Sequence, residues 1–168
     1  MITMKTIDRR PQRNAFEKMT MSHIETALSR LAAGFNCSQA VLSAYAEHFG
    51  FDEETAMKIS SGFGGGMGRM GDTCGVVTGA FMVLGLKYGQ NSPDREAKET
   101  IYARIKDFAE RFKKRNGSLA CRVLLGCDIS TPEGLQQARK AEMFSKTCPK
   151  FLRDACEILE EMLNVNQE

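Results

Sequence analysis

Six glycines lie between residues 62 and 71, in the stretch GFGGGMGRMG, and Cys74 follows shortly afterwards. Glycine loses more backbone freedom on folding than any other residue. A run this dense therefore destabilises the fold unless the local backbone conformation requires glycine. A turn with positive φ, or a close approach to another group, would create that need. The next segment, residues 76–86, is apolar nearly all round, which predicts a buried helix ending at Gly89. The sequence therefore predicts a Gly-rich loop before a buried central helix.

Within this run, residues 66–71 read GMGRMG and have the spacing of a dinucleotide-binding loop. Such a loop follows a strand in a βαβ unit, whereas residues 52–60, DEETAMKIS, favour a helix. No Gly-Lys-Ser/Thr follows, so a phosphate-binding loop is excluded as well. One remaining interpretation is a flexible loop between helices. The other is a backbone that passes close to a group bound by Cys74. On the second interpretation the candidate cofactor-binding residues are Gly64, Gly65, Gly66, Gly68, Thr73 and Gly75.

The rest of the chain has the apolar periodicity of helices, with no strand-like alternation. Capping residues and Gly or Pro punctuation predict helices over residues 22–34, 36–50, 52–59, 74–89, 93–115 and 118–125, and a last one from Pro149. Residues 131–133, Thr-Pro-Glu, begin a segment left unassigned. Residues 1–20 lack periodicity and are expected to be a mobile arm. The prediction is an all-α, compact single-domain bundle of about six to seven helices spanning residues 21–168.

Composition excludes several functional classes. The chain has 168 residues and a net charge of +2, with no basic stripe beyond residues 113–115, so nucleic-acid binding is not expected. No apolar run is long enough for a membrane span and no signal peptide is evident, so a cytoplasmic location is expected. Because reducing compartments disfavour structural disulfides, the six cysteines favour metal binding or redox chemistry.

Four cysteines share one position relative to the predicted helices. Cys37, Cys74, Cys121 and Cys148 each lie near a helix N-terminus. The helix dipole and free N–H groups there stabilise a thiolate, which predicts a pKa below the ordinary value of about 8.5. A thiolate is both a nucleophile and a metal ligand. We therefore expect these four residues to converge on one site.

The other cysteines and the histidines fit a structural role better. Cys156 lies on the apolar stripe of the last helix and is expected to be a buried structural thiol, whereas Cys127 is ambiguous. His23 and His48 lack paired ligand spacing and are expected to be exposed. No C-x-x-C occurs, which disfavours a thioredoxin-type motif and a zinc knuckle.

Four segments together resemble a known family: FNCSQAV, SGFGGGMGRMGDTCGVVTGA, GSLACRVLLG and TCPKFLRDACEILEEML. Their order is similar to that of the redox-active family named for its C_GCAxxG_C_C pattern, over residues 22–163. The resemblance implies a small helical bacterial protein, an oxidoreductase or an electron carrier, with characteristic cysteines at Cys37, Cys74, Cys121 and Cys148. Val76 stands where the family often has alanine, which preserves an apolar helix position.

Three hypotheses follow for these cysteines. The leading one is convergence on one site, as ligands of an iron–sulfur cluster or as two redox-active pairs serving an unidentified redox partner. The second is metal-free thiol–disulfide exchange, for which four cysteines allow three pairings. The third is a zinc-stabilised or metal-free helical scaffold that binds a partner through its N-terminal arm. A homodimer is also expected, because the helix over residues 74–88 needs cover on all sides.

Overall fold

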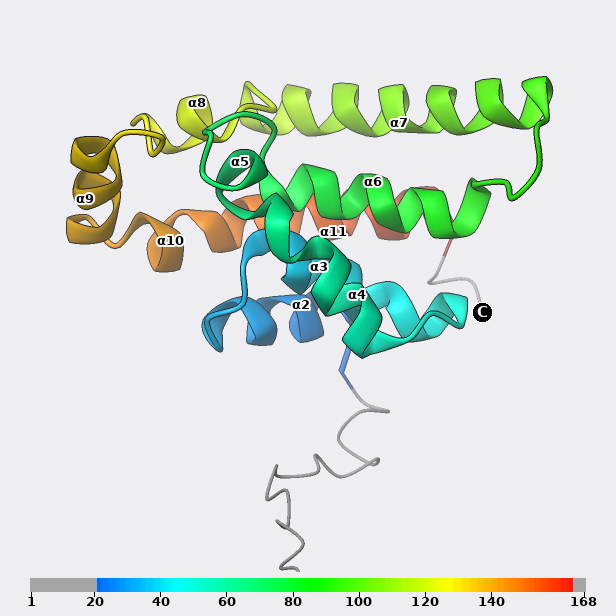
Figure 1. Ribbon diagram of the computed structural model, residues 1–168, viewed down its shortest axis with the longest axis horizontal. Coiled ribbons are helices and arrows are strands. Elements are labelled where there is room, and N and C mark those ends of the chain that lie inside the picture. The colour runs from blue at the N-terminus through cyan, green and yellow to red at the C-terminus, as the bar shows by residue number, and fades with distance from the viewer. Residues whose placement is uncertain (1–20, 165–168) are drawn as a thin grey trace, which may run out of the picture.

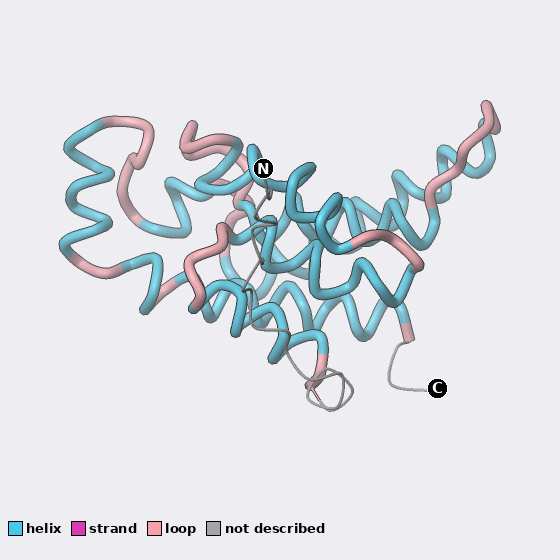
Figure 2. Tube along the Cα trace, turned by 60° about the horizontal axis from the view of Figure 1, so that its bottom comes forward, coloured by secondary structure: helices cyan, strands magenta, loops and turns pink. Residues whose placement is uncertain are grey.

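The structure is a computed structural model that describes residues 21–164, and within them it confirms the all-α prediction (Figure 1). Figure 2 shows helices joined by loops, without a strand among the described residues. The expected arm over residues 1–20 lies outside the described range. No described helix is both long and apolar enough to cross a membrane. The longer helices are α2 (His23–Ala32), α3 (Cys37–Ala46), α4 (Glu53–Ser60), α6 (Gly75–Tyr88), α7 (Arg95–Asn116), α9 (Pro132–Lys140) and α11 (Cys148–Leu163).

Short helical segments connect the long ones. They are the 3₁₀ turns η1 (Glu47–Phe49) and η2 (Ser61–Phe63) and the helices α5 (Gly64–Met67), α8 (Cys121–Leu125) and α10 (Met143–Lys146). The unassigned segment after residue 131 is the helix α9, whose first turn is capped by the Thr131 hydroxyl accepting from the Gly134 N–H at 3.1 Å. Two expected starts were wrong: Pro93 lies before the first turn of α7, because the Asp94 carboxylate is the N-cap and accepts from Ala97 N. Ser118 likewise lies before α8, whose N-cap is Ala120.

Reciprocal side-chain caps fix the starts of α2 and α3. The Ser22 hydroxyl accepts from the Glu25 N–H, and the Glu25 carboxylate accepts from the Ser22 N–H. Asn36 makes the same reciprocal pair with Gln39 at the start of α3. Each arrangement satisfies two N–H groups that a helix would otherwise leave unpaired. These caps confirm the predicted starts of α2 and α3.

The helix α6 is the centre of the core. It runs between α3, α7 and α11, and none of its apolar residues is exposed (Figure 1). Its contact with α3 is close, because a Cβ on Gly79 would lie 2.9 Å from Val41 Cβ and 3.0 Å from Ser38 O. The sequence led us to expect that a second copy of the chain would cover α6. In the structure, helices of the same chain cover it instead. The homodimer stays a prediction.

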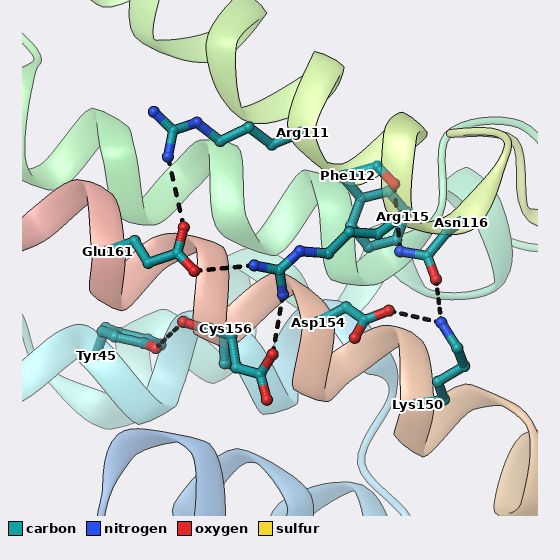
Figure 3. Close-up of polar contacts among 10 residues, drawn as sticks. Tyr45, Arg111, Phe112, Arg115, Asn116, Lys150, Asp154, Cys156 and Glu161 are labelled. Carbon is teal, nitrogen blue, oxygen red and sulfur yellow. Dashed lines mark hydrogen bonds and ion pairs between the residues drawn. The ribbon is translucent and has the colours of Figure 1, made fainter.

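Charged side chains join α7 to α11 along one exposed side (Figure 3). Arg115 donates to Glu157 at 2.9 Å and to Glu161 at 2.9 Å. Lys150, in the first turn of α11, donates to Asn116 Oδ1 at 2.7 Å. Exposed ion pairs contribute little to stability, about 0–1 kcal/mol each, so their main effect is to fix how the two helices lie together.

The Gly-rich run folds into a tight left-handed turn. Every residue from 65 to 69 has a positive φ, between 63° and 69°. An L-residue with a side chain loses about 1–2 kcal/mol in this conformation, which explains the glycines at 65, 66 and 68. Met67 and Arg69 adopt it despite their side chains, with φ of 64° and 69°. The turn also closes on its own backbone, with Asp72 N donating to Gly66 O at 3.1 Å.

Two of these glycines distinguish backbone strain from close packing. At Gly66 a Cβ would lie 2.7 Å from Asp72 N and 2.7 Å from Cys121 Cβ, whereas at Gly68 the nearest atom would be Gly62 O at 3.4 Å. Gly68→Ala should therefore lower the free energy of unfolding by about 1 kcal/mol, from strain alone. Gly66→Ala should lower it by about 3 kcal/mol or more, because the clash adds to the same strain.

Urea unfolding of both variants beside the unmodified protein measures this difference. Equal losses for Gly66→Ala and Gly68→Ala would show that the turn does not pack against Cys121 as described.

Candidate functional site

Backbone pairing brings Cys74 and Cys121 together. Cys74 N donates to Leu119 O at 2.8 Å, and Cys121 N donates to Asp72 O at 2.6 Å, on either side of an isolated antiparallel bridge between Thr73 and Ala120. Cys74 is the N-cap of α6 and Cys121 is the first residue of α8. Each thiol is close enough to the other to shift its pKa. The bridge thus places two distant cysteines side by side.

Arg122 holds this backbone pairing from the outside. Its guanidinium donates to Gly71 O at 3.1 Å, to Met70 O at 2.7 Å and to the Asp72 carboxylate at 3.0 Å. These bonds satisfy carbonyl groups at the end of the left-handed turn, next to Cys74. Arg122 is a positioning residue that sequence reasoning missed, since its partners lie some fifty residues away; its place directly after Cys121 was the only available signal.

A second pair forms between the starts of α3 and α11. Cys37 and Cys148 are the first residues of these helices, and the Cys148 thiol is close enough to Cys37 to raise its pKa. The Asn36 side chain that caps α3 also donates to Ser61 O at 2.9 Å, which ties this helix start to the Gly-rich turn. Gly75 allows the first pair to approach the second, since a Cβ there would lie 3.0 Å from Cys37 Cβ.

The four cysteines line the same cavity, which has a volume of about 1000 Å³. Cys74, Cys121 and Cys148 are 4–5% exposed, and Cys37 is half-buried. Of the candidate cofactor-binding residues, Gly64, Gly65, Gly68 and Gly75 line the cavity, whereas Gly66 and Thr73 do not. Gly66 instead packs against Cys121, and Thr73 is part of the backbone bridge.

The expectation of a lowered pKa at every helix-start cysteine holds for Cys74 and is wrong for Cys37 and Cys121. The pKa of Cys74 is lowered by the hydrogen bond from Cys121, with further help from the N–H groups of Val76, Val77 and Gly75 in the first turn of α6. The pKa of Cys121 is raised because its proton is held in the bond to Cys74 and because the thiol is buried. The hydrogen bond to Cys148 and burial likewise raise the pKa of Cys37. The first pair therefore combines one thiol of lowered pKa with one of raised pKa.

The remaining candidates lie elsewhere. Cys156 is fully buried on α11, where burial raises the pKa of its thiol to about 12, in agreement with the predicted structural role. Its carbonyl accepts from the Tyr45 hydroxyl at 3.3 Å (Figure 3). Cys127 is buried with its sulfur 3.7 Å from Met143 Sδ. His48 is exposed as expected, but His23 is half-buried and stacked on the Tyr45 ring at 4.5 Å.

The cavity's cysteines lie near one another but are not arranged as a closed ligand set among the described residues. Among residues 21–164, no group of three or more His, Cys, Asp or Glu side chains is arranged to hold a metal ion. A four-thiolate site needs all four sulfurs directed at one centre. Within the described residues, these cysteines therefore do not form a preformed metal centre.

Comparison with known proteins identifies a family. The model of a family described as "Putative redox-active protein (C_GCAxxG_C_C)" matches residues 35–162, a segment that contains all four of these cysteines. No curated protein and no solved structure matches the chain.

The electrostatics of the first pair predict how Cys74 reacts with pH. Since its pKa is lowered, the Cys74 thiolate should be alkylated by iodoacetamide with a pH midpoint below that of a free cysteine, about 8.5. Cys121→Ala should move the midpoint to higher pH and slow the reaction at neutral pH by about tenfold, because one hydrogen bond to a charged group is lost. Cys121→Ser keeps a hydrogen-bond donor, so its pH midpoint for Cys74 alkylation should lie between those of the unmodified protein and Cys121→Ala.

Peptide mass analysis of Cys74 at each pH gives the rates. A midpoint that does not respond to Cys121→Ala would contradict the hydrogen bond between the two thiols.

Proposed function

Because the chain belongs to the C_GCAxxG_C_C family of redox-active proteins, we propose that it carries out thiol–disulfide exchange with two dithiol pairs, Cys74–Cys121 and Cys37–Cys148. The observation that carries the proposal is that all four thiols line one cavity, where the backbone bridge between Thr73 and Ala120 brings Cys74 and Cys121 together. Such an arrangement lets each pair pass between a dithiol and a disulfide. The protein would then act as an oxidoreductase or as a carrier between redox partners.

In the first pair the residues have distinct roles. The Cys74 thiolate attacks one sulfur of a disulfide substrate, forms a mixed disulfide with it and releases one thiolate product. Cys121 then loses its proton and attacks the Cys74 sulfur, which breaks the mixed disulfide and releases the second product. The outcome is one Cys74–Cys121 disulfide and two product thiols, with two electrons passed to the substrate. Cys37 and Cys148, which line the same cavity, would carry out the same exchange.

Oxidation of the reduced protein should yield two defined disulfides, Cys74–Cys121 and Cys37–Cys148. Cys74→Ser should abolish the first disulfide and leave the second, since each pair needs only its own two sulfurs. Cys156→Ala is the matched control and should leave both, because Cys156 is buried on α11 away from the cavity wall.

Mass mapping of peptides after oxidation identifies the linkages. A dominant Cys37–Cys74 or Cys121–Cys148 linkage, or scrambled linkages, would overturn the pairing.

The second candidate function is electron transfer through an iron–sulfur cluster. One observation favours it: the four cavity cysteines match the number of thiolates that such a cluster takes. The pairs would have to separate and redirect their sulfurs, since the described residues hold no ready group of three ligands. Iron and sulfide analysis of anaerobically purified protein decides between the candidates. The dithiol account expects neither element in stoichiometric amount, and a cluster lost on Cys74→Ser would replace that account.

A further inference from the structure

We propose that the substrate of this cavity is a small disulfide with an apolar body and a carboxylate or similar anionic group. This inference rests on the dithiol function proposed above and names the substrate class of the same site. Three features of the cavity lead to it: the charge of its wall, the chemistry of its surface and its size.

The charge of the wall is entirely positive. The charged residues that line the cavity are Arg69 and Arg139, and no Asp or Glu is among the lining residues. Both arginines are exposed, and neither guanidinium has an ion-pair or hydrogen-bond partner among residues 21–164. Arg122 nearby contrasts with them, since it is paired with Asp72 and Asp128. The wall thus presents two unpaired cations, which favour an anion.

The two arginines come from separate parts of the chain. Arg69 ends the left-handed turn, where its side chain lies over Gly65: a Cβ on Gly65 would be 3.0 Å from Arg69 Cγ. Arg139 lies in the last turn of α9. The positive φ of Arg69 makes the residue costly at this place. That cost is understandable if the guanidinium has a ligand there.

Most of the remaining wall is apolar. Leu28 and Leu31 of α2, Leu124 of α8, Leu135 of α9 and Phe144 of α10 line it, together with Phe35 before α3. Phe35 is 42% exposed although it is aromatic. A volume of about 1000 Å³ suits a small molecule, because ligand cavities commonly measure about 300–1000 Å³. A bound disulfide would place its apolar body on this surface and its sulfurs near the Cys74 thiolate.

The exchange is the one described for the first pair, with an anionic disulfide as the oxidant. Two protein thiols become the Cys74–Cys121 disulfide, the substrate S–S bond breaks, and the substrate leaves as two thiols carrying two electrons and two protons. The arginines take no part in bond making. They bind the anionic group and orient the S–S bond toward Cys74, so they are substrate-positioning residues.

Two aromatic disulfides of opposite character test the proposal. Dithiobis(nitrobenzoate) carries carboxylates, whereas dithiodipyridine is uncharged. The reduced protein should react with the first faster, relative to a free thiol as reference. In the double variant Arg69→Asn/Arg139→Gln, the reaction rate with the anionic reagent should fall about tenfold. The rate with the neutral reagent should change by less than about twofold. Asparagine suits position 69 because it tolerates a positive φ.

Arg95→Gln is the matched control, since it removes an exposed positive charge at the start of α7 that does not line the cavity. It should leave both rates unchanged. Equal losses with the two reagents, or no loss with the anionic one, would overturn the substrate class. If neither reagent produces the Cys74–Cys121 disulfide, the dithiol function itself fails, so the two failures are distinguishable.

Discussion

The candidate site depends on one short stretch of backbone pairing. Residues 71–74 lie beside residues 119–122, and the bonds from Cys74 N to Leu119 O and from Cys121 N to Asp72 O fix their register. The left-handed turn makes this possible, because it reverses the chain tightly enough for residues 71–74 to reach α8. Gly66 provides the space that Cys121 needs. The Gly-rich run therefore serves the geometry of a cysteine pair, and no described feature connects it with nucleotide binding.

The electrostatics of the pair follow from that geometry. A lone buried thiol has a raised pKa, as Cys156 does, because burial disfavours the thiolate. Cys74 is also buried, yet its pKa is lowered, since Cys121 and the first N–H groups of α6 hydrogen-bond to its sulfur. The two thiols of the pair thus have pKa values shifted in opposite directions. This asymmetry separates an attacking sulfur from a resolving one, which is what dithiol exchange requires.

Short-range chemistry made much of the fold predictable from the sequence. Ser22, Asn36 and Asp52 cap helices by bonds to residues three positions later, so their signals lie within a few letters. The predicted start of α7 was misplaced because both Pro93 and Asp94 are typical of helix starts, and the local sequence does not indicate which one lies at the N-cap. The cysteine pairing was not predictable, since it depends on a bridge between Thr73 and Ala120. For the same reason the helix-start argument gave the wrong direction of pKa shift at Cys37 and Cys121: the neighbouring thiol outweighs the helix end.

The central claim is that four of the six cysteines work as two separate pairs. The most direct measurement is a count of free thiols under denaturing conditions, during anaerobic titration of the reduced protein with an oxidant. The account predicts a fall from six thiols to two, in two steps of two electrons each, with Cys127 and Cys156 as the thiols that remain. A count that stays at six, or that falls only when Cys127 or Cys156 is consumed, would contradict it.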